Sequence, residues 1–392
     1  DRACMAVRIK LSNKGIKLGH EFHRGLMRSP ASLSYEQAQA AFDGRYDEAT
    51  RPLAGALSNL FSAYQSSIRA REERQPLNLD LPERKIILSE EGAVLSIDFR
   101  TRFDAHKLVE EFMVTANVCA AETLEAKDKN LLYRVHEEPS PEKLEGLREV
   151  AEASGLELAK GQVLKTQHLN KLLAAAENTE DSEIINMTVL RCMAQAYYAP
   201  NNFGHFGLNL RRYAHFTSPI RRYADLIVHR ALVSVHDFGD DGLSSEEEAV
   251  LKETGEWIST TERRSMLAER DTTDRYLAAF LADRIGVEFT GRVSGIAKFG
   301  LFVKLDDTGA DGIIPLSKLG REYWHYDDRN RTLKGDDSGR IIAIGMPCKV
   351  ALVDATAVTG GLTLEMLELK GNEMPKGSGR QTSHKGRLIT RS

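Results

Sequence analysis

The segment RYAHFTSPIRRYADLIVHR, residues 212–230, decides how the whole chain is interpreted. Two hydroxyl residues, either of them a suitable N-cap, precede Pro219, and apolar residues then recur at helical spacing. The pattern predicts a helix that begins at Pro219 and carries Arg221 and Arg222 in its first turn. Free backbone N–H groups and the positive end of the helix dipole would meet two guanidinium groups there, which predicts a binding site for a phosphate group.

A plainer interpretation is that Arg221 pairs with Asp225 at i, i+4 spacing on a solvent-facing helix, with Arg222 unpaired. The length of the pattern favours phosphate binding. Together with HFGLNL at residues 205–210, the segment resembles the signature of the RNase II/RNase R family of processive 3′-to-5′ exoribonucleases. The resemblance implies that Arg221 contacts the phosphate undergoing cleavage, and we expect Arg222 and Tyr223 to bind RNA beside it.

The resemblance extends over residues 1–369 and identifies further candidate site residues. Tyr35, in SLSY, matches a tyrosine near the scissile phosphate that helps to set the length of the end product. A long helix matches one whose glutamate contacts the terminal nucleotide, here Glu110, with Glu111 as the alternative. Glu269, in MLAERD, matches a glutamate that faces the substrate end. From the residues alone, a packed aromatic and solvent-facing helix carboxylates would be expected at these positions.

Phosphodiester hydrolysis needs an activated water and neutralisation of negative charge, and the resemblance implies Mg²⁺ held by carboxylates. The family's aspartate cluster, DxxxxxDxDDA, should lie well upstream of Tyr35, before the first residue of this sequence. Paired aspartates elsewhere lie in segments typical of solvated turns: Asp240 and Asp241, Asp306 and Asp307, Asp327 and Asp328, Asp336 and Asp337. We therefore expect no metal ligands in this chain, which would be part of an RNase R-like protein and inactive without an N-terminal segment.

Two other classes of function are open. A homologue that has lost its metal site would be a non-catalytic RNA-binding protein. A metal hydrolase could use His20, Glu21 and His23, or His205 with His215, although a third ligand is not evident around the H-E-x-H spacing.

Composition sets broader bounds. The 392 residues are 42% hydrophobic and carry a net charge of −4, as in an ordinary globular protein of two or three domains. The four cysteines are far apart and form no CxxC pair, which favours a reducing, cytoplasmic location over a disulfide framework or zinc site. The apolar runs are interrupted by charges, so a membrane span is not predicted. Single-stranded RNA is the expected partner, and we expect a monomer.

Residues 1–285 are predicted to form an α+β partial catalytic domain, in which strands give way to helices. The strands are expected in two hairpins, at 5–29 and 85–99. The helices are expected at 34–42, 53–74, 104–124, 141–154, 182–198, 219–235 and 246–284.

Residues 286–369 are short strands punctuated by glycine, which predicts a five-stranded OB-fold barrel. The run resembles the S1 RNA-binding domain, with Phe299 and Phe302 at positions where bases could stack. Packing of one of these rings in the core is the alternative. The aromatic run Tyr323–Tyr326 lies in a polar insertion, where it could stack on RNA or anchor its own loop.

Residues 370–392 carry six basic residues and one acidic residue, a net charge of +5. We expect this tail to be disordered and to bind RNA through its cations. The cations expected to do so are Lys370, Lys376, Arg380, Lys385 and Arg387. Within the resembled family, this tail and the RRY at residues 221–223 favour the RNase R branch.

Overall fold

The computed structural model describes residues 1–79, 83–159, 163–179, 181–320, 322–328 and 332–375. Contacts divide the chain into two compact units, residues 1–80 with 101–263, and residues 81–100 with 264–392. This division differs from the boundary expected after residue 285, because a hairpin and the end of a long helix pack with the barrel. Mixed strands and helices followed by a closed barrel confirm the predicted fold class.

The first unit opens with an antiparallel hairpin, as predicted. Its strands are β1 (Arg2–Leu11) and β2 (Lys17–Met27). The helices that follow are α1 (Tyr35–Phe42), α2 (Ala54–Arg74), α3 (Asp104–Ala126), α4 (Pro141–Ala153), α5 (Thr166–Ala176), α6 (Ser182–Cys192), α7 (Tyr223–His236) and α8 (Ser245–Ala249), with a 3₁₀ turn at Arg51–Leu53. Helix α9 (Leu251–Leu281) continues into the second unit.

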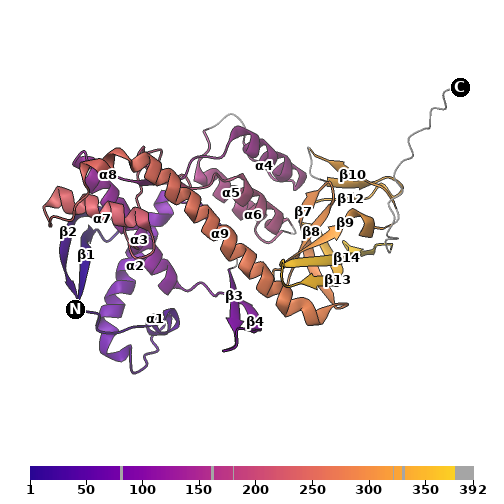
Figure 1. Ribbon diagram of the computed structural model, residues 1–392, viewed down its shortest axis with the longest axis horizontal. Helices are drawn as coiled ribbons and strands as arrows, with labels where there is room; N and C mark the ends of the chain where they lie inside the picture. Colours follow the sequence, from indigo (N-terminus) through magenta and orange to yellow (C-terminus); the bar gives the residue numbers. More distant parts are fainter. Residues whose placement is uncertain (80–82, 160–162, 180, 321, 329–331, 376–392) are drawn as a thin grey trace. The chain divides into compact units, whose positions relative to one another are not determined.

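Two apolar clusters stabilise this unit. One joins the inner face of the β1–β2 hairpin, including Phe22, to α3 and α7, which lie beside the hairpin in Figure 1. The other joins α4, α5 and α6. Alternation along β2 buries Phe22 and leaves its neighbours exposed.

The helix predictions need correction at α5 and α6. Helix α5 was missed, although Leu169, Leu172, Leu173 and Ala176 recur at helical spacing and are buried. The helix predicted at 182–198 ends at Cys192, and the strand β6 (Tyr197–Ala199) pairs with β5 (Tyr133–Val135).

The second unit is built around a closed barrel. Its strands are β7 (Glu288–Ala297), β8 (Gly300–Leu305), β9 (Asp311–Pro315), β13 (Pro347–Thr356) and β14 (Gly361–Leu369). They lie in the order β13-β7-β8-β9-β14, and pairing of β13 with β14 closes the barrel. The insertion forms a small sheet of β10 (Trp324–Asp327), β11 (Thr332–Gly335) and β12 (Ile341–Ile342), after a 3₁₀ turn at Leu316–Lys318.

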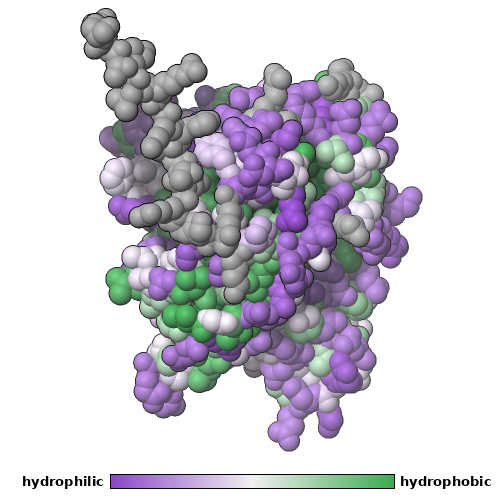
Figure 2. Space-filling model, turned by 90° about the vertical axis from the view of Figure 1, so that its right-hand side faces the viewer, coloured by the Kyte–Doolittle hydropathy of each residue, from purple (hydrophilic) through white to green (hydrophobic). Residues whose placement is uncertain are grey.

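The barrel core extends beyond the barrel strands. Leu277 and Leu281 of α9 are buried within it, and Ile97 packs against it from the hairpin of β3 (Arg84–Leu88) and β4 (Val94–Phe99). A 3₁₀ turn at Ala282–Arg284 joins α9 to the barrel. The face seen in Figure 2 is mostly hydrophilic, with one larger group of hydrophobic side chains and smaller groups elsewhere.

The predicted start of the tail at Lys370 is wrong. Lys370 lies in a turn, and β15 (Asn372–Glu373) then pairs with β14. Met374 is buried in the barrel core, so residues 370–375 belong to the barrel. The remaining tail cations named above, Lys376, Arg380, Lys385 and Arg387, lie outside the described residues.

None of the helices in the described part of the chain combines the length and the hydropathy needed to cross a membrane.

Candidate functional site

The helix that follows the arginine pair begins at Tyr223, not at Pro219 as predicted. Before it, the N–H groups of Arg221 and Arg222 donate to the Ser218 carbonyl at 3.3 and 3.1 Å, which closes a turn. Arg222 then has extended backbone angles, so the helix cannot start earlier. The two arginines therefore precede the first helical turn.

The buried carboxylate of Asp225 explains this turn. It accepts a hydrogen bond from the Ser218 N–H at 2.8 Å and another from the Arg222 guanidinium at 2.8 Å. Asp225 is fully buried, and a buried carboxylate requires such partners. The Asp225 side chain, which belongs to the first turn of α7, thus keeps the residues from Ser218 to Arg222 out of that helix.

The alternative interpretation, an ion pair between Arg221 and Asp225, is wrong, because Arg222 occupies that carboxylate. Arg221 is exposed, and its guanidinium group makes no hydrogen bond or ion pair with any residue that the structure describes. Ile220 and Tyr223 beside it are 102% and 53% exposed. The turn therefore presents one uncommitted guanidinium group to an incoming anion.

The loop before this turn is anchored to the middle of α3. The Asn117 amide accepts from the Phe216 N–H at 2.8 Å and donates to the Tyr213 hydroxyl at 2.9 Å. Asn117 is 1% exposed, and both aromatic residues are buried. The carbonyl oxygen and the NH₂ group of the Asn117 side chain therefore both hold the loop that carries Arg221.

Two histidines of this region are held neutral. Burial, together with the positive charges of Arg222 and Arg134, lowers the pKa of His215 to about 2. Burial also lowers the pKa of His205 to about 3. His215 Nδ1 lies 2.9 Å from the Tyr198 hydroxyl, whose pKa burial raises to about 12, so the hydroxyl donates to the ring.

These histidines should make the first unit sensitive to acid. Because the folded pKa of His215 lies below the ordinary value of 6.5, the unfolded chain takes up the proton first as pH falls. The stabilising contribution of neutral His215 is fully present above pH 6.5 and is lost progressively as the pH falls to about 2. Between pH 7 and 5, each of these two half-buried histidines should lower the free energy of unfolding by about 2 kcal/mol. Urea unfolding at both pH values should show a smaller loss for His215→Asn.

The exposed His23→Asn variant is the control for that experiment, and it should keep the wild-type pH dependence. An equal loss of stability between pH 7 and 5 in wild type and His215→Asn would contradict the assignment.

Tyr35 begins α1, after Ser34, whose side chain accepts from the Gln37 N–H in a capping box. The ring is 43% exposed and stacks on His106, with 3.8 Å between ring centroids. His106 and Glu110 are four residues apart on α3 and so share one face of the helix. The structure thus brings Tyr35 to the face of α3 that carries Glu110, although 75 positions separate them in the numbering.

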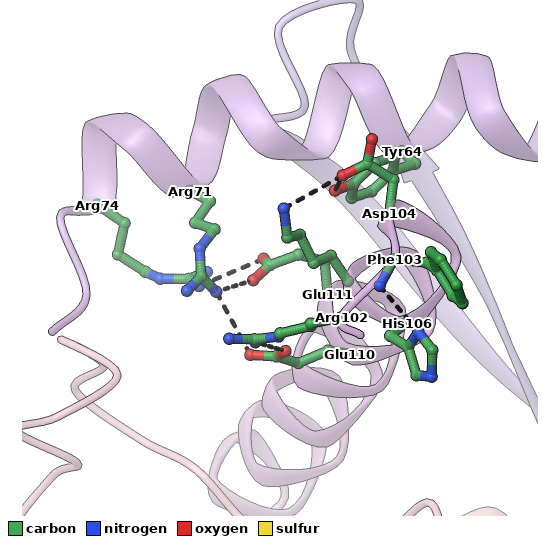
Figure 3. A network of polar contacts seen from close by, with 10 residues as sticks. Tyr64, Arg71, Arg74, Arg102, Phe103, Asp104, His106, Glu110 and Glu111 are labelled. Atoms are coloured by element: carbon green, nitrogen blue, oxygen red, sulfur yellow. Dashed lines mark hydrogen bonds and ion pairs between the residues drawn. The ribbon is translucent and has the colours of Figure 1, made fainter. Parts of the chain in front are cut away.

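Glu110 lines a cavity of about 900 Å³ in the first unit, between α2, α3 and α5. Its carboxylate is 38% exposed and pairs with Arg102. Glu111 is only 4% exposed, and its carboxylate is held by Arg71 and Arg74, as Figure 3 shows. Of the two glutamates, Glu110 is the one that a ligand can reach.

Helix α3 connects these features. Seven residues separate Glu110 from Asn117, which anchors the Arg221 loop, a rise of about 10 Å along a helix. The positions of Glu110 and Arg221 therefore both depend on α3, although Arg221 lies about a hundred residues after that helix in the sequence.

Glu269 lies on the part of α9 that belongs to the second unit. It lines a separate cavity of about 440 Å³ with residues of β3 and α9, among them Arg84, Thr272 and Tyr276. Tyr35, Glu110 and Arg221 belong to the first unit.

The histidine clusters do not support a metal hydrolase. His20 lies on a strand, and strand alternation directs His20 and His23 to opposite faces. His20 bonds to Thr123, whereas His23 lies 3.6 Å from Glu21. His205 accepts from the Leu208 N–H and so closes a turn within HFGLNL. In the described ranges, His, Cys, Asp and Glu side chains do not gather in any group of three or more that could hold a metal ion.

In the barrel, neither candidate stacking residue is buried. Phe299 is 62% exposed, and Phe302 packs edge-on against it with 6.1 Å between ring centroids. Trp324 is 2% exposed and donates its indole N–H to the Leu319 carbonyl at 3.0 Å, so it anchors the insertion. Tyr323 is 52% exposed and remains accessible.

Comparison with known proteins assigns both parts of the chain. Residues 1–237 match the RNB domain, and residues 282–341 match the S1 RNA binding domain. The chain belongs to the RNase II/RNase R family. Its sequence is 36% identical over 355 residues to Ribonuclease R of Escherichia coli K12, an alignment that covers 88% of this chain and 44% of the relative. The chain thus spans less than half the length of this relative of the RNase II/RNase R family.

Solved structures of the family share the fold. The apo form of Mycoplasma genitalium RNase R is 24% identical in sequence, with a TM-score of 0.86. The superposition covers 93% of this chain and 58% of the Mycoplasma genitalium chain. The same protein in complex with ribose-methylated single-stranded RNA is 25% identical, with a TM-score of 0.85 and the same coverage of both chains. This chain is therefore a member of a ribonuclease family, with an RNB part and an S1 part.

Proposed function

We propose that this chain is part of a processive 3′-to-5′ exoribonuclease that releases nucleoside 5′-monophosphates from single-stranded or structured RNA. The exposed Arg221 carries the proposal. Its neighbour Arg222 neutralises Asp225, so the Arg221 guanidinium is left available for a phosphate group. A planar guanidinium can donate two parallel hydrogen bonds to phosphate oxygens and stabilise charge that develops on them. The solved relative with bound single-stranded RNA supports RNA as the ligand.

We propose further that the reaction uses Mg²⁺ whose ligands lie in a segment outside this sequence. Two divalent ions held by carboxylates would supply the activated water. The residues that the structure describes do not fit such a site, since they offer no suitable group of three ligands. Arg221 is accordingly assigned phosphate binding and charge stabilisation only. A cytoplasmic location is proposed because all four cysteines are free thiols.

The barrel and tail should bind single-stranded RNA with little sequence preference. The tail beyond Pro375 holds five cations and no acidic residue. Removing residues 376–392 from the chain should therefore lower the slope of log affinity against log salt concentration by up to about 3.5, since each phosphate contact to a single strand adds about 0.7. Fluorescence anisotropy with labelled oligouridylate at several salt concentrations measures the slope.

The matched comparison is Phe299→Ala, which removes an exposed ring and no charge. It should weaken binding by about 1 to 3 kcal/mol at every salt concentration and leave the slope unchanged. An unchanged slope after tail deletion would show that the tail cations do not contact RNA.

A further inference from the structure

Glu110 and Glu111 meet the same guanidinium group. Neighbours on a helix point about 100° apart, so their carboxylates ordinarily face different surroundings. Here Arg71 NH1 donates to Glu111 Oε1 and lies 3.6 Å from Glu110 Oε1. In Figure 3, Arg71 reaches across from α2 to both glutamates of α3. One arginine therefore links the buried carboxylate to the exposed one.

Arg71 is itself fixed from several directions. Its partner Glu111 is buried, and a buried carboxylate strongly favours retention of its cation. The helix that carries Arg71 ends three residues later, where Asn209 donates to the Arg74 carbonyl and Thr166 donates to the Gln75 carbonyl. The Arg71 side chain is only 25% exposed. Its guanidinium is thus held in place on the cavity wall.

The second partner of Glu110 is held less firmly. Arg102 pairs with the other carboxylate oxygen, but its side chain is 47% exposed. An exposed ion pair contributes little to stability and exchanges readily with a competing ligand. Arg71 is therefore the partner that can keep Glu110 in one orientation when a ligand enters the cavity.

We propose that Arg71 is a positioning residue, which holds the Glu110 carboxylate so that it accepts hydrogen bonds from the terminal ribose of bound RNA. An ionised carboxylate only accepts hydrogen bonds, and hydroxyl groups are the donors that a ribose offers. Since the ligand is RNA, this role rests on the function proposed above. The contact between Arg71 and Glu110 does not depend on it.

The chain offers a matched control for this role. Arg74 lies one turn beyond Arg71 on α2 and also pairs with Glu111, at 3.3 Å, but it has no contact with Glu110 in the described structure. Arg71→Gln and Arg74→Gln each remove one cation from Glu111, whereas only Arg71→Gln removes one from Glu110. The double variant Arg71→Gln/Glu111→Gln removes the buried carboxylate together with its cation, so no buried carboxylate is left unpaired, and this guards against loss of folding.

The first measurement is the crystal structure of each variant of the 392-residue chain. Glu110 should leave its orientation in Arg71→Gln/Glu111→Gln and keep it in Arg74→Gln. An unchanged Glu110 side chain in the double variant would overturn the proposal whether or not the chain binds RNA.

The second measurement is the affinity of the same proteins for short oligoadenylates that end in ribose or in 2′-deoxyribose. Wild type should prefer the ribose end, and Arg71→Gln should reduce that preference by about tenfold, as for one lost charge-assisted hydrogen bond. Arg74→Gln should retain the preference, and Arg71→Lys should restore part of it. In a Glu110→Gln background, Arg71→Gln should have no further effect.

The outcomes separate the two proposals. A wild-type preference that Arg71→Gln and Arg74→Gln reduce equally would show that Arg71 only neutralises Glu111, and the positioning role would be wrong. A wild-type chain that binds neither oligonucleotide would count against the proposed function, and the crystal structures would still decide whether Arg71 positions Glu110.

Discussion

Arg221→Ala should lower the rate of RNA cleavage by about two to four orders of magnitude in the proposed exoribonuclease, in which a metal-binding segment would complete this chain. RNA binding should weaken only modestly, because the contact matters most when charge develops on the transferred phosphoryl group. Arg221 has no structural partner to lose within the described residues, and its side chain is exposed, so the folded state should be unaffected. The measurement is single-turnover cleavage of a 5′-labelled oligonucleotide, combined with thermal unfolding.

Two further variants sharpen this result. Arg221→Lys should recover the rate only in part, since an ammonium group lacks the planar pair of donors. Arg69→Ala removes another exposed arginine of the same unit and should cleave RNA at the wild-type rate. Wild-type cleavage by Arg221→Ala would refute the role assigned to this residue.

The second large effect concerns the 392-residue chain alone. Incubated with 5′-labelled poly(A) and Mg²⁺ or Mn²⁺, it should bind RNA and release no mononucleotides, because an arginine cannot activate water. Cleavage should appear when the metal-binding segment is supplied, either covalently or as a separate polypeptide that completes the fold. Thin-layer chromatography of the products measures both results.

Each alternative gives a different outcome. Robust metal-dependent degradation by the chain alone would mean that one of the paired aspartates, such as Asp240 and Asp241, belongs to a metal site after all. Failure to recover cleavage with the added segment would favour a non-catalytic RNA-binding homologue. The Arg221→Ala variant serves as the inactive reference in the reconstituted sample.

The sequence predicted the elements whose patterns are local. Alternation of apolar residues identified the first hairpin, and the spacing of Gly and short strands identified the barrel. The start of α7 was missed because Asp225 acts on Ser218, seven residues away, and the N-cap signal at Pro219 carries no information about that bond. A side chain that accepts a hydrogen bond from the backbone seven residues earlier competes with the helical hydrogen bonds that the local sequence favours.

The candidate site shows the same limit. Sequence similarity pointed to the Glu110 and Glu111 pair but left open which of them a ligand reaches. The choice depends on Arg71 and Arg74, about 40 residues earlier, and on the burial that they allow for Glu111. Asn117 was likewise missed, because a helix amide gives no sign that a distant loop will use both of its polar atoms.

The packing of Leu277, Leu281 and Ile97 into the barrel core has an evolutionary consequence. A barrel that completed its own interior could be moved between proteins as a cassette, with any linker. This one depends on the end of a helix and on a hairpin encoded nearly two hundred residues before its first strand. Recombination that cut the gene at the first barrel strand would leave apolar surface exposed on both products. Exchange of the barrel between relatives is therefore constrained to take the helix end and a compatible hairpin with it.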